Sequence, residues 1–265
     1  MRGFLAYLEL QARLLRARLL PRFMLLGVLA AAALPVLVAD AAPERGFAVL
    51  ADAVGLVVST VVILSVVLAA VSFSGDSSSG ALRTLLVRPI PRSTLICGQA
   101  LMLGITSGLL YIIGVLVAWF LTARLVGFAH ISHEGYEILS LEVMESYARR
   151  LVFLPLPALL CAPLVALAVS SIVDDVALSV VVSLALVMGP FFFSSISDAL
   201  PRWFFTEQAH LPVEILRDLA RGIETHAAEV DAGVLAREAT LYPLGFGAGV
   251  LALALLFFNL RDFKS

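Results

Sequence analysis

Six long apolar segments constrain what this chain can fold into. Each is long enough for a helix to cross the hydrocarbon core of a bilayer, which takes roughly 20 residues, and none contains an arginine or a lysine. Backbone groups in lipid must be satisfied within the segment, so such segments are helices rather than strands. The six predicted spans are 23–41, 53–73, 95–121, 151–170, 176–197 and 241–260. We therefore expect an all-α polytopic membrane protein, with one transmembrane domain over residues 1–265.

Composition and charge exclude several other classes of protein. Hydrophobic residues make up 61% of the chain and charged residues 14%, against about 45–50% and about 25% in a typical soluble domain. An ordinary soluble enzyme and a disordered chain are both excluded by this surplus. The formal net charge of -2 argues against a nucleic-acid partner, because a nucleic-acid binder needs a basic face.

The distribution of charge between the spans predicts the orientation. If the N-terminus is inside, the inner segments are 1–22, 74–94, 171–175 and 261–265, and together they carry more basic than acidic residues. The outer segments carry more acidic than basic residues. Basic residues prefer the cytoplasmic side of a membrane. We therefore expect both termini in the cytoplasm of a cell, with the chain in its inner membrane.

The first 22 residues are patterned like an interfacial helix. Leucines and alanines recur at three- and four-residue steps from Leu5 to Leu19, and Arg2, Arg13 and Arg16 fall on another face. Such a helix lies in the membrane interface with its arginines toward the lipid headgroups. The alternative is a cleaved signal peptide that ends near Ala41. The length and the patterning of the basic region argue against this alternative.

Two outer segments, 122–150 and 198–240, are too long to be simple turns. Both contain apolar residues at helical steps, among them Val143 and Tyr147 in the first and Val213 and Leu216 in the second. We expect extracytoplasmic amphipathic helices that rest on the membrane surface or on each other. The stretch 189–195, which contains a glycine and a proline, predicts a break in the fifth span.

Residues that could carry chemistry in this chain are few. A GxxxxGK[ST] phosphate loop cannot exist, because the only lysine is Lys264. His130 and His133 next to Glu134 have a spacing that could hold a metal, but surface positions are the favoured interpretation. We therefore predict no catalytic, cofactor or metal site. The candidate intramembrane polar residues are Asp52, Ser59 and Ser65, although a serine hydroxyl in a helix equally often bonds to its own backbone.

The segment between the second and third spans is the most informative. Ser79 and Gly80 can open a short helix over 81–87, and Pro89 and Pro91 end it. Arginines at 83, 88 and 92 then face the cytoplasm. A short helix held at the membrane edge between two spans could transmit the movement of a soluble partner to the spans.

This segment resembles the coupling region of the ABC-type-2 permeases, the membrane subunits of ATP-binding-cassette exporters. That family has an acidic residue, then a run similar to Ser-Gly-Ala-Leu-Arg-Thr-Leu-Leu-Val-Arg-Pro-Ile-Pro-Arg at 79–92. The chain departs from the pattern in having Asp76 where Glu is usual and in the stretch Ser77-Ser78. Gly98-Gln99 stands where the family often has Gly-Lys. The residues that the resemblance assigns to contact with an ATPase are Asp76, Ser79, Gly80, Leu82, Arg83, Leu86, Arg88, Pro89, Pro91, Arg92, Asp174 and Asp175.

The resemblance implies that the chain is not itself an enzyme. Two copies of a separate ATPase subunit would bind ATP and Mg²⁺. A second permease subunit would complete a dimer in the lipid bilayer, either a homodimer or a close heterodimer. Because the spans offer few charged groups, an amphiphilic or hydrophobic substrate for export is the preferred cargo. The alternatives are a non-transporting scaffold or sensor, and a permease of the same family for ion extrusion or metal-centre assembly.

Overall fold

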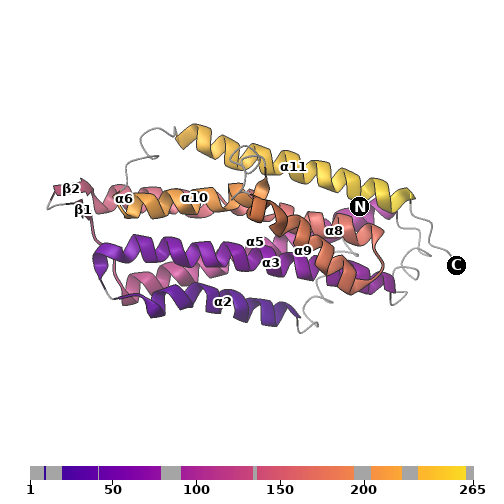
Figure 1. Cartoon of the computed structure of the whole chain (residues 1–265), viewed down its shortest axis with the longest axis horizontal. Helices are drawn as coiled ribbons and strands as arrows, with labels where there is room; N and C mark the ends of the chain where they lie inside the picture. The colour runs from indigo at the N-terminus through magenta and orange to yellow at the C-terminus, as the bar shows by residue number, and fades with distance from the viewer. Residues whose placement is uncertain are drawn as a thin grey trace.

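The computed structural model describes residues 9, 20–40, 42–78, 91–133, 136–193, 204–222 and 232–260 as an elongated bundle of helices (Figure 1). Its elements are α2 (Leu20–Val38), η1 (Pro43–Arg45), α3 (Gly46–Ser78), α5 (Arg92–Leu125), β1 (Ile131–His133), β2 (Tyr136–Leu139), α6 (Leu141–Phe153), α7 (Leu156–Leu159), α8 (Cys161–Ile172), α9 (Val176–Phe193), α10 (Phe205–Ala220) and α11 (Ala232–Leu260). Strands β1 and β2 form one small antiparallel hairpin. The predicted all-helical class is confirmed, apart from this hairpin.

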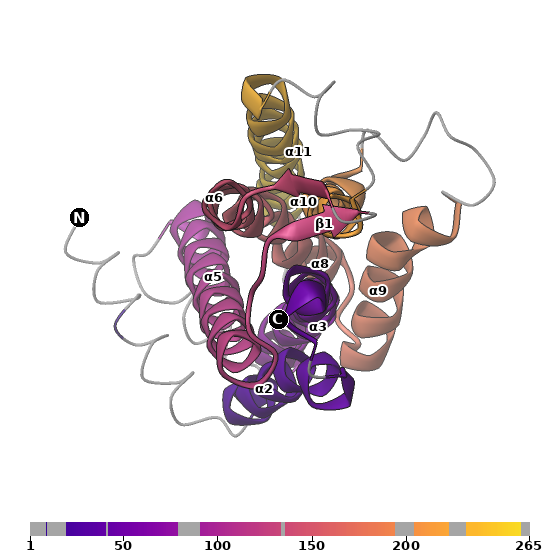
Figure 2. The ribbon, with the colours of Figure 1, turned by 90° about the vertical axis from the view of Figure 1, so that its left-hand side faces the viewer.

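Helix α3 forms the centre of the bundle. Viewed along the bundle, α2, α5, α8 and α9 surround it, and α11 lies outside α8 (Figure 2). The sequence explains this position, because α3 is apolar over most of its surface. Val54, Val57, Val58 and Val61 share one face of the helix and are fully buried, whereas Leu56 and Ile63 on the opposite face are 41% and 40% exposed.

Five helical stretches among the described residues are long and apolar enough to cross a membrane: Leu20–Val38, Pro43–Gly75, Arg92–Leu125, Leu141–Ile172 and Arg237–Leu260. The multi-pass membrane character predicted from the sequence is therefore confirmed. The predicted fifth span corresponds to α9, whose apolar part, Val176–Pro190, is shorter than the others. Helix α9 passes through Gly189 and Pro190 to Phe193, so the predicted break is wrong at those two residues.

The helices extend beyond the limits that the apolar segments set. Helix α3 begins at Gly46, before Asp52, and α11 begins at Ala232, before Glu238. An apolar segment ends at the first charged residue, whereas the hydrogen bonds of a helix continue for as long as the backbone allows. Helices α3, α5 and α11 are therefore longer than the apolar segments that predicted them.

Prolines interrupt the fourth predicted span. Pro155 lies between α6 and α7, and Pro157 lies near the start of the short α7; a proline has no backbone N–H to donate, so the helix is broken here. The buried hydroxyl of Tyr111, on α5, donates a hydrogen bond to the carbonyl of Val152 at the end of α6. This side chain satisfies a backbone group next to the break and joins α5 to the fourth span.

The amphipathic helices expected in the two outer segments are present as α6 and α10. Val213, Leu216 and Ala220, which share the apolar face of α10, are buried. The two helices contact each other and run along the bundle axis beside the first part of α3 (Figure 1). They therefore lengthen the bundle rather than lying across its end. The predicted interfacial helix over residues 1–22 lies outside the described residues, except for Glu9 and the start of α2.

Gly114 allows α5 to approach both α2 and α3. A Cβ atom at this position would lie 2.7 Å from Val28 Cγ1 and 2.7 Å from Val57 Cγ1, which is closer than such atoms can come. Both valines are fully buried, so neither has free space to move into. The absence of a side chain at Gly114 is therefore a requirement of the packing of three helices.

We expect Gly114→Ala to lower the free energy of unfolding, because overpacking a well-packed core costs roughly 1–3 kcal/mol. Gly108→Ala is a matched control on the same helix, since its Cβ would meet Leu156 Cδ2 at an ordinary 3.9 Å. The measurement is the melting temperature of each variant in mild detergent. Equal melting temperatures for the two variants would contradict this account of the packing.

Candidate functional site

The two helices that flank the predicted coupling segment meet at one end of the bundle, at the right of Figure 1. Helix α3 ends there, α5 begins there, and the α8–α9 turn and the C-terminal end of α11 lie beside them. Ser74 Oγ on α3 donates a hydrogen bond of 3.2 Å to the carbonyl of Val173 in that turn. Arg92 Nη1 on α5 donates one of 3.3 Å to the carbonyl of Asn259 on α11.

A small apolar cluster holds this end together. The rings of Phe73 on α3 and Phe258 on α11 meet edge to face, with their centroids 5.5 Å apart. Leu95 and Ile96 from α5 and Leu167 from α8 complete the cluster, and all of these side chains are buried. Four helices are therefore packed against one another at the end where the predicted coupling segment connects two of them.

The structure places only part of the predicted coupling set. Asp76 belongs to the last turn of α3, Pro91 directly precedes α5, and Arg92 is the first residue of α5. Ser79, Gly80, Leu82, Arg83, Leu86, Arg88 and Pro89 lie outside the described residues, as does the short helix predicted over 81–87. The described members within 76–92 are therefore those at its two ends, next to α3 and α5.

Asp174 and Asp175 are exposed in the α8–α9 turn, at the same end of the bundle. Asp175 also has a structural role that the sequence analysis missed. Its Oδ1 accepts a hydrogen bond of 2.7 Å from the backbone N–H of Leu178, so it caps the N-terminus of α9. An aspartate directly before an apolar helical segment is a recognised helix-start signal, which could have predicted this role.

The three candidate intramembrane polar residues do not form a common site. Ser59 Oγ donates to the carbonyl of Gly55 and Ser65 Oγ to that of Val62, each at 3.0 Å, so both hydroxyls are satisfied by their own helix. Asp52 is 49% exposed and accepts a hydrogen bond of 2.8 Å from Arg217 Nε on α10. This ion pair joins α3 to α10, and the sequence analysis did not predict Arg217 as the partner.

No group of three or more metal-ligating side chains occurs in the part of the chain that the structure describes. His133 belongs to the hairpin and Glu134 lies outside the described residues, so the pairing considered for a metal stays untested. No protein-family model matches the chain, and no curated protein matches it. The function of the chain must therefore be inferred from its own sequence and structure.

We expect Asp175→Ala to lower the free energy of unfolding by about 1 kcal/mol, because removal of an N-cap leaves a backbone N–H of the helix without its acceptor. Asp175→Asn keeps an acceptor oxygen and should retain most of the stability. Thermal melting of both variants in the same detergent measures the difference. An equal loss in both would show that the charge, not the cap, is what stabilises this turn.

His210 on α10 should make the stability depend on pH. Burial lowers the pKa of His210 below its ordinary value of 6.5, and the positive charge of Arg217 lowers it further. The unfolded chain binds the proton more readily, so this contribution to stability is complete above pH 6.5 and is lost as the pH falls below it.

We therefore expect the melting temperature in detergent to fall between pH 8 and pH 5.5, and to fall less in His210→Gln. The variant has no group that titrates in this range at position 210. The same decrease in the wild-type protein and in the variant would contradict the role of His210.

Proposed function

We propose that this chain is the transmembrane permease subunit of an ATP-binding-cassette exporter, driven by a separate ATPase that docks on the segment 76–92. Two features support the proposal. The segment carries the run from Ser79 to Arg92 that resembles the coupling region of such permeases. Its flanking residues belong to α3 and α5, which meet at one end of a bundle with membrane-spanning helices.

The anchoring of this segment is the observation that carries the proposal. Helix α3 leads into it, and α3 contacts α2, α5, α8, α9 and α10. At the coupling end, Ser74 and Phe73 tie α3 to the α8–α9 turn and to α11. A displacement of the segment by an ATPase would therefore reach the whole bundle through its central helix, while Asp174 and Asp175 offer a second contact at the same end.

The proposed topology has six spans, with α9 as the fifth, and both termini in the cytoplasm. It follows from the excess of basic residues in segments 1–22 and 74–94. Two copies of the chain and two ATPase subunits would form the complete exporter in the inner membrane of a bacterium, since a twofold pair is the commonest symmetric arrangement.

The proposed cargo is amphiphilic or hydrophobic. The buried polar side chains among the described residues are hydroxyls and amides, such as Ser107, Thr122 and Gln99, and no charged side chain is among them. A strongly charged solute would meet no compensating charge in that interior, and burying an unpaired charge is costly. ATP and Mg²⁺ would be bound by the ATPase, because the chain has no phosphate-binding loop.

Pull-down of the chain in mild detergent, from cells that express its native genetic neighbours, tests the proposal. We expect stoichiometric recovery of a soluble protein with a phosphate-binding loop, identified by mass spectrometry. The double variant Arg83→Glu with Arg88→Glu should lose this protein, because two charges in the docking segment are reversed. Arg45→Glu with Arg237→Glu is the matched control and should retain it.

Recovery of the chain without any ATPase, under conditions that preserve other transporter complexes, would contradict the permease function. A scaffold or sensor would then be the better description. Equal recovery of the ATPase with the Arg83/Arg88 variant and with the control would leave the complex intact but disprove docking on the segment 76–92.

A further inference from the structure

Helix α10 keeps its charged residues on one side. The positions of α10 that are not buried are Glu207, His210, Leu211, Glu214, Arg217 and Asp218. All of them except Leu211 are charged residues or histidine. They recur at steps of three and four residues, with Asp218 beside Arg217, so they form one stripe along the helix. We call Glu207, His210, Glu214, Arg217 and Asp218 the α10 stripe.

The outer boundary of the hydrocarbon core lies at Asp52 of α3. Between Asp52 and Asp76, α3 carries no charged residue, and this length of about 35 Å fits a hydrocarbon core of about 30 Å. Gly114 on α5 lies against Val57 on α3, and the two helices run in opposite directions, so Trp119 is level with Asp52. Tryptophan is enriched at the boundary between hydrocarbon and headgroups.

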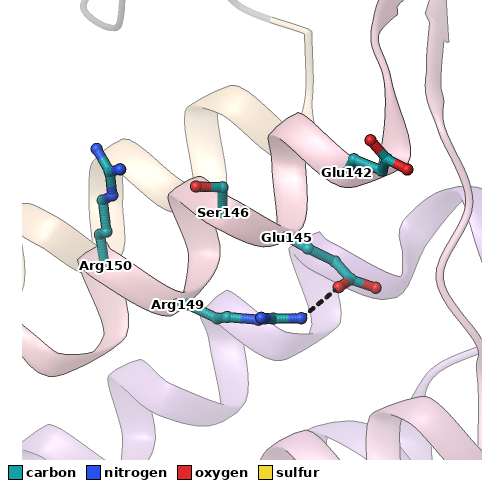
Figure 3. A pocket seen from close by; sticks show the side chains of 5 residues that line it. All are labelled: Glu142, Glu145, Ser146, Arg149 and Arg150. Carbon is teal, nitrogen blue, oxygen red and sulfur yellow. Dashed lines mark hydrogen bonds and ion pairs between the residues drawn. The ribbon is translucent and has the colours of Figure 1, made fainter.

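Charged residues of α6 mark the same boundary. Glu145 and Arg149 line a hollow of about 460 Å³ together with Trp119 of α5. Their side chains form an ion pair of 2.8 Å on the surface of α6 (Figure 3). Helices α3, α5 and α6 therefore give one common level for the outer boundary.

Helix α10 runs from this boundary to the middle of the bilayer. Arg217 Nε donates a hydrogen bond of 2.8 Å to Asp52 Oδ1, so Arg217 lies at the boundary. Val213 lies against Gly55, the next position inward on α3, so α10 goes deeper as its residue numbers fall. Glu207 precedes Arg217 by ten residues, which is about 15 Å along the helix, or half of a core about 30 Å thick.

The start of α10 gives the same depth. The rings of Phe205 and Phe246 pack with their centroids 5.3 Å apart, and Phe246 lies near the middle of the span Arg237–Leu260. Helix α9 approaches the start of α10 from the coupling end (Figure 1). Its apolar part, Val176–Pro190, is shorter than the other spans. Helix α10 therefore completes the fifth crossing, which α9 begins.

At this depth, the α10 stripe requires a polar medium. Charged side chains within a membrane face the interior of a bundle or a water-filled space, because hydrocarbon does not solvate them. Glu214 is exposed, and Glu207 and His210 are partly exposed, so the stripe is not part of the packed core of the described chain. Water beside the stripe would solvate these groups from the outer boundary to the middle of the bilayer.

The inner end of the stripe carries a buried hydroxyl group. Thr206 lies one helical turn from His210 on the same side of α10. It is only 3% exposed, and its Oγ1 makes no hydrogen bond within the described part of the chain. Buried polar atoms in proteins are normally hydrogen-bonded. Thr206 Oγ1, next to the carboxylate of Glu207, is therefore suited to bind water or a small cation.

The charge of the stripe favours cations. Arg217 is neutralised by Asp52, and α10 contains no other arginine or lysine. The carboxylates of Glu207, Glu214 and Asp218 therefore make this side of the helix negative. A path lined with one sign of charge raises the local concentration of ions of the opposite sign.

We propose that the α10 stripe lines a water-filled path for small cations, protons included. The path begins at the Asp52–Arg217 pair and ends at Glu207 and Thr206, in the middle of the bilayer. It opens at the end of the bundle opposite the coupling segment. The path requires no ATPase, so the inference goes beyond the proposed function.

Cysteine labelling in a lipid bilayer tests whether water reaches the stripe. The full-length chain with Cys97→Ser and Cys161→Ser has no native thiol, because the sequence contains two cysteines. Glu207→Cys, His210→Cys and Glu214→Cys are introduced one at a time, so that one variant that does not fold leaves two others. Each protein, in phospholipid nanodiscs, is treated with the cationic thiol reagent 2-(trimethylammonium)ethyl methanethiosulfonate, and the rate of labelling is followed by mass spectrometry.

Leu109→Cys on α5 is the matched control for depth. Leu109 is 55% exposed, and it lies as far inward from Trp119 as Glu207 lies from Arg217. We expect the three stripe positions to be labelled about a hundredfold faster than Leu109→Cys, because a thiol in hydrocarbon stays protonated and only the thiolate reacts.

A second reagent tests the preference for cations. The anionic reagent 2-sulfonatoethyl methanethiosulfonate is compared with the cationic one at His210→Cys. Relative to their rates with a free thiol in solution, we expect the cationic reagent to be favoured about tenfold, because the carboxylates of the stripe attract it. Adding Glu214→Gln should lower this preference. Adding Glu142→Gln, which removes an exposed carboxylate of α6 (Figure 3), should leave it unchanged.

Labelling of all three stripe positions as slowly as Leu109→Cys would overturn the proposal, because lipid or a second copy of the chain would then cover the stripe. Fast labelling of Glu214→Cys with slow labelling of Glu207→Cys and His210→Cys would also overturn it, since water would stop near the boundary. Equal preference for the two reagents would disprove the assignment to cations. A chain that captures no ATPase but shows the expected labelling would disprove the proposed function and leave this inference intact.

Discussion

The position of α3 at the centre of the bundle is the constraint on which the rest of the structure depends. Most of its surface is buried against other helices, and its hydroxyls at Ser59 and Ser65 are satisfied by its own carbonyls. It must also be approached closely, and Gly114 provides that space on α5. At Asp52, which lies on the partly exposed side of α3, a partner from α10 accompanies the charge. Packing around one apolar helix therefore determines where polar residues are allowed.

The two ends of the bundle differ in chemistry. At one end, Phe73, Ser74 and Phe258 pack four helices together beside the segment that leads out of α3. At the other end, α6 and α10 present charged faces, an ion pair and a hairpin. Under the proposed function, the first end receives movement from an ATPase.

The sequence predicts the membrane-spanning helices well because length and the absence of charge are local properties. It fails wherever a feature depends on residues far apart in the chain. Asp52 and Arg217 are separated by 165 positions, so no periodicity could pair them. Leu116 on α5 and Phe153 on α6 line the same hollow, and only the fold brings them together. The orientation of α10 along the bundle depends likewise on its contacts with α3.

The coupling segment stays a prediction, because residues 79–90 lie outside the described part of the chain. Its motif is local in the sequence, and of its flanking residues Pro91 precedes α5 and Arg92 is the first residue of α5. The capping role of Asp175 was missed because its carboxylate was considered only as a contact for a partner, although its position before an apolar helix indicates a cap. An aspartate can both cap a helix and contact a partner, and the sequence analysis considered only the contact.

The length of α3 has a consequence for how the protein is made. Its 33 residues extend about 50 Å, whereas the hydrocarbon core of a bilayer is about 30 Å thick. Part of α3 must then extend beyond the hydrocarbon core, or the helix must tilt within it. Helix α10, which packs against α3, lies between α9 and α11 in the chain, so α3 receives this packing partner only when synthesis is nearly finished.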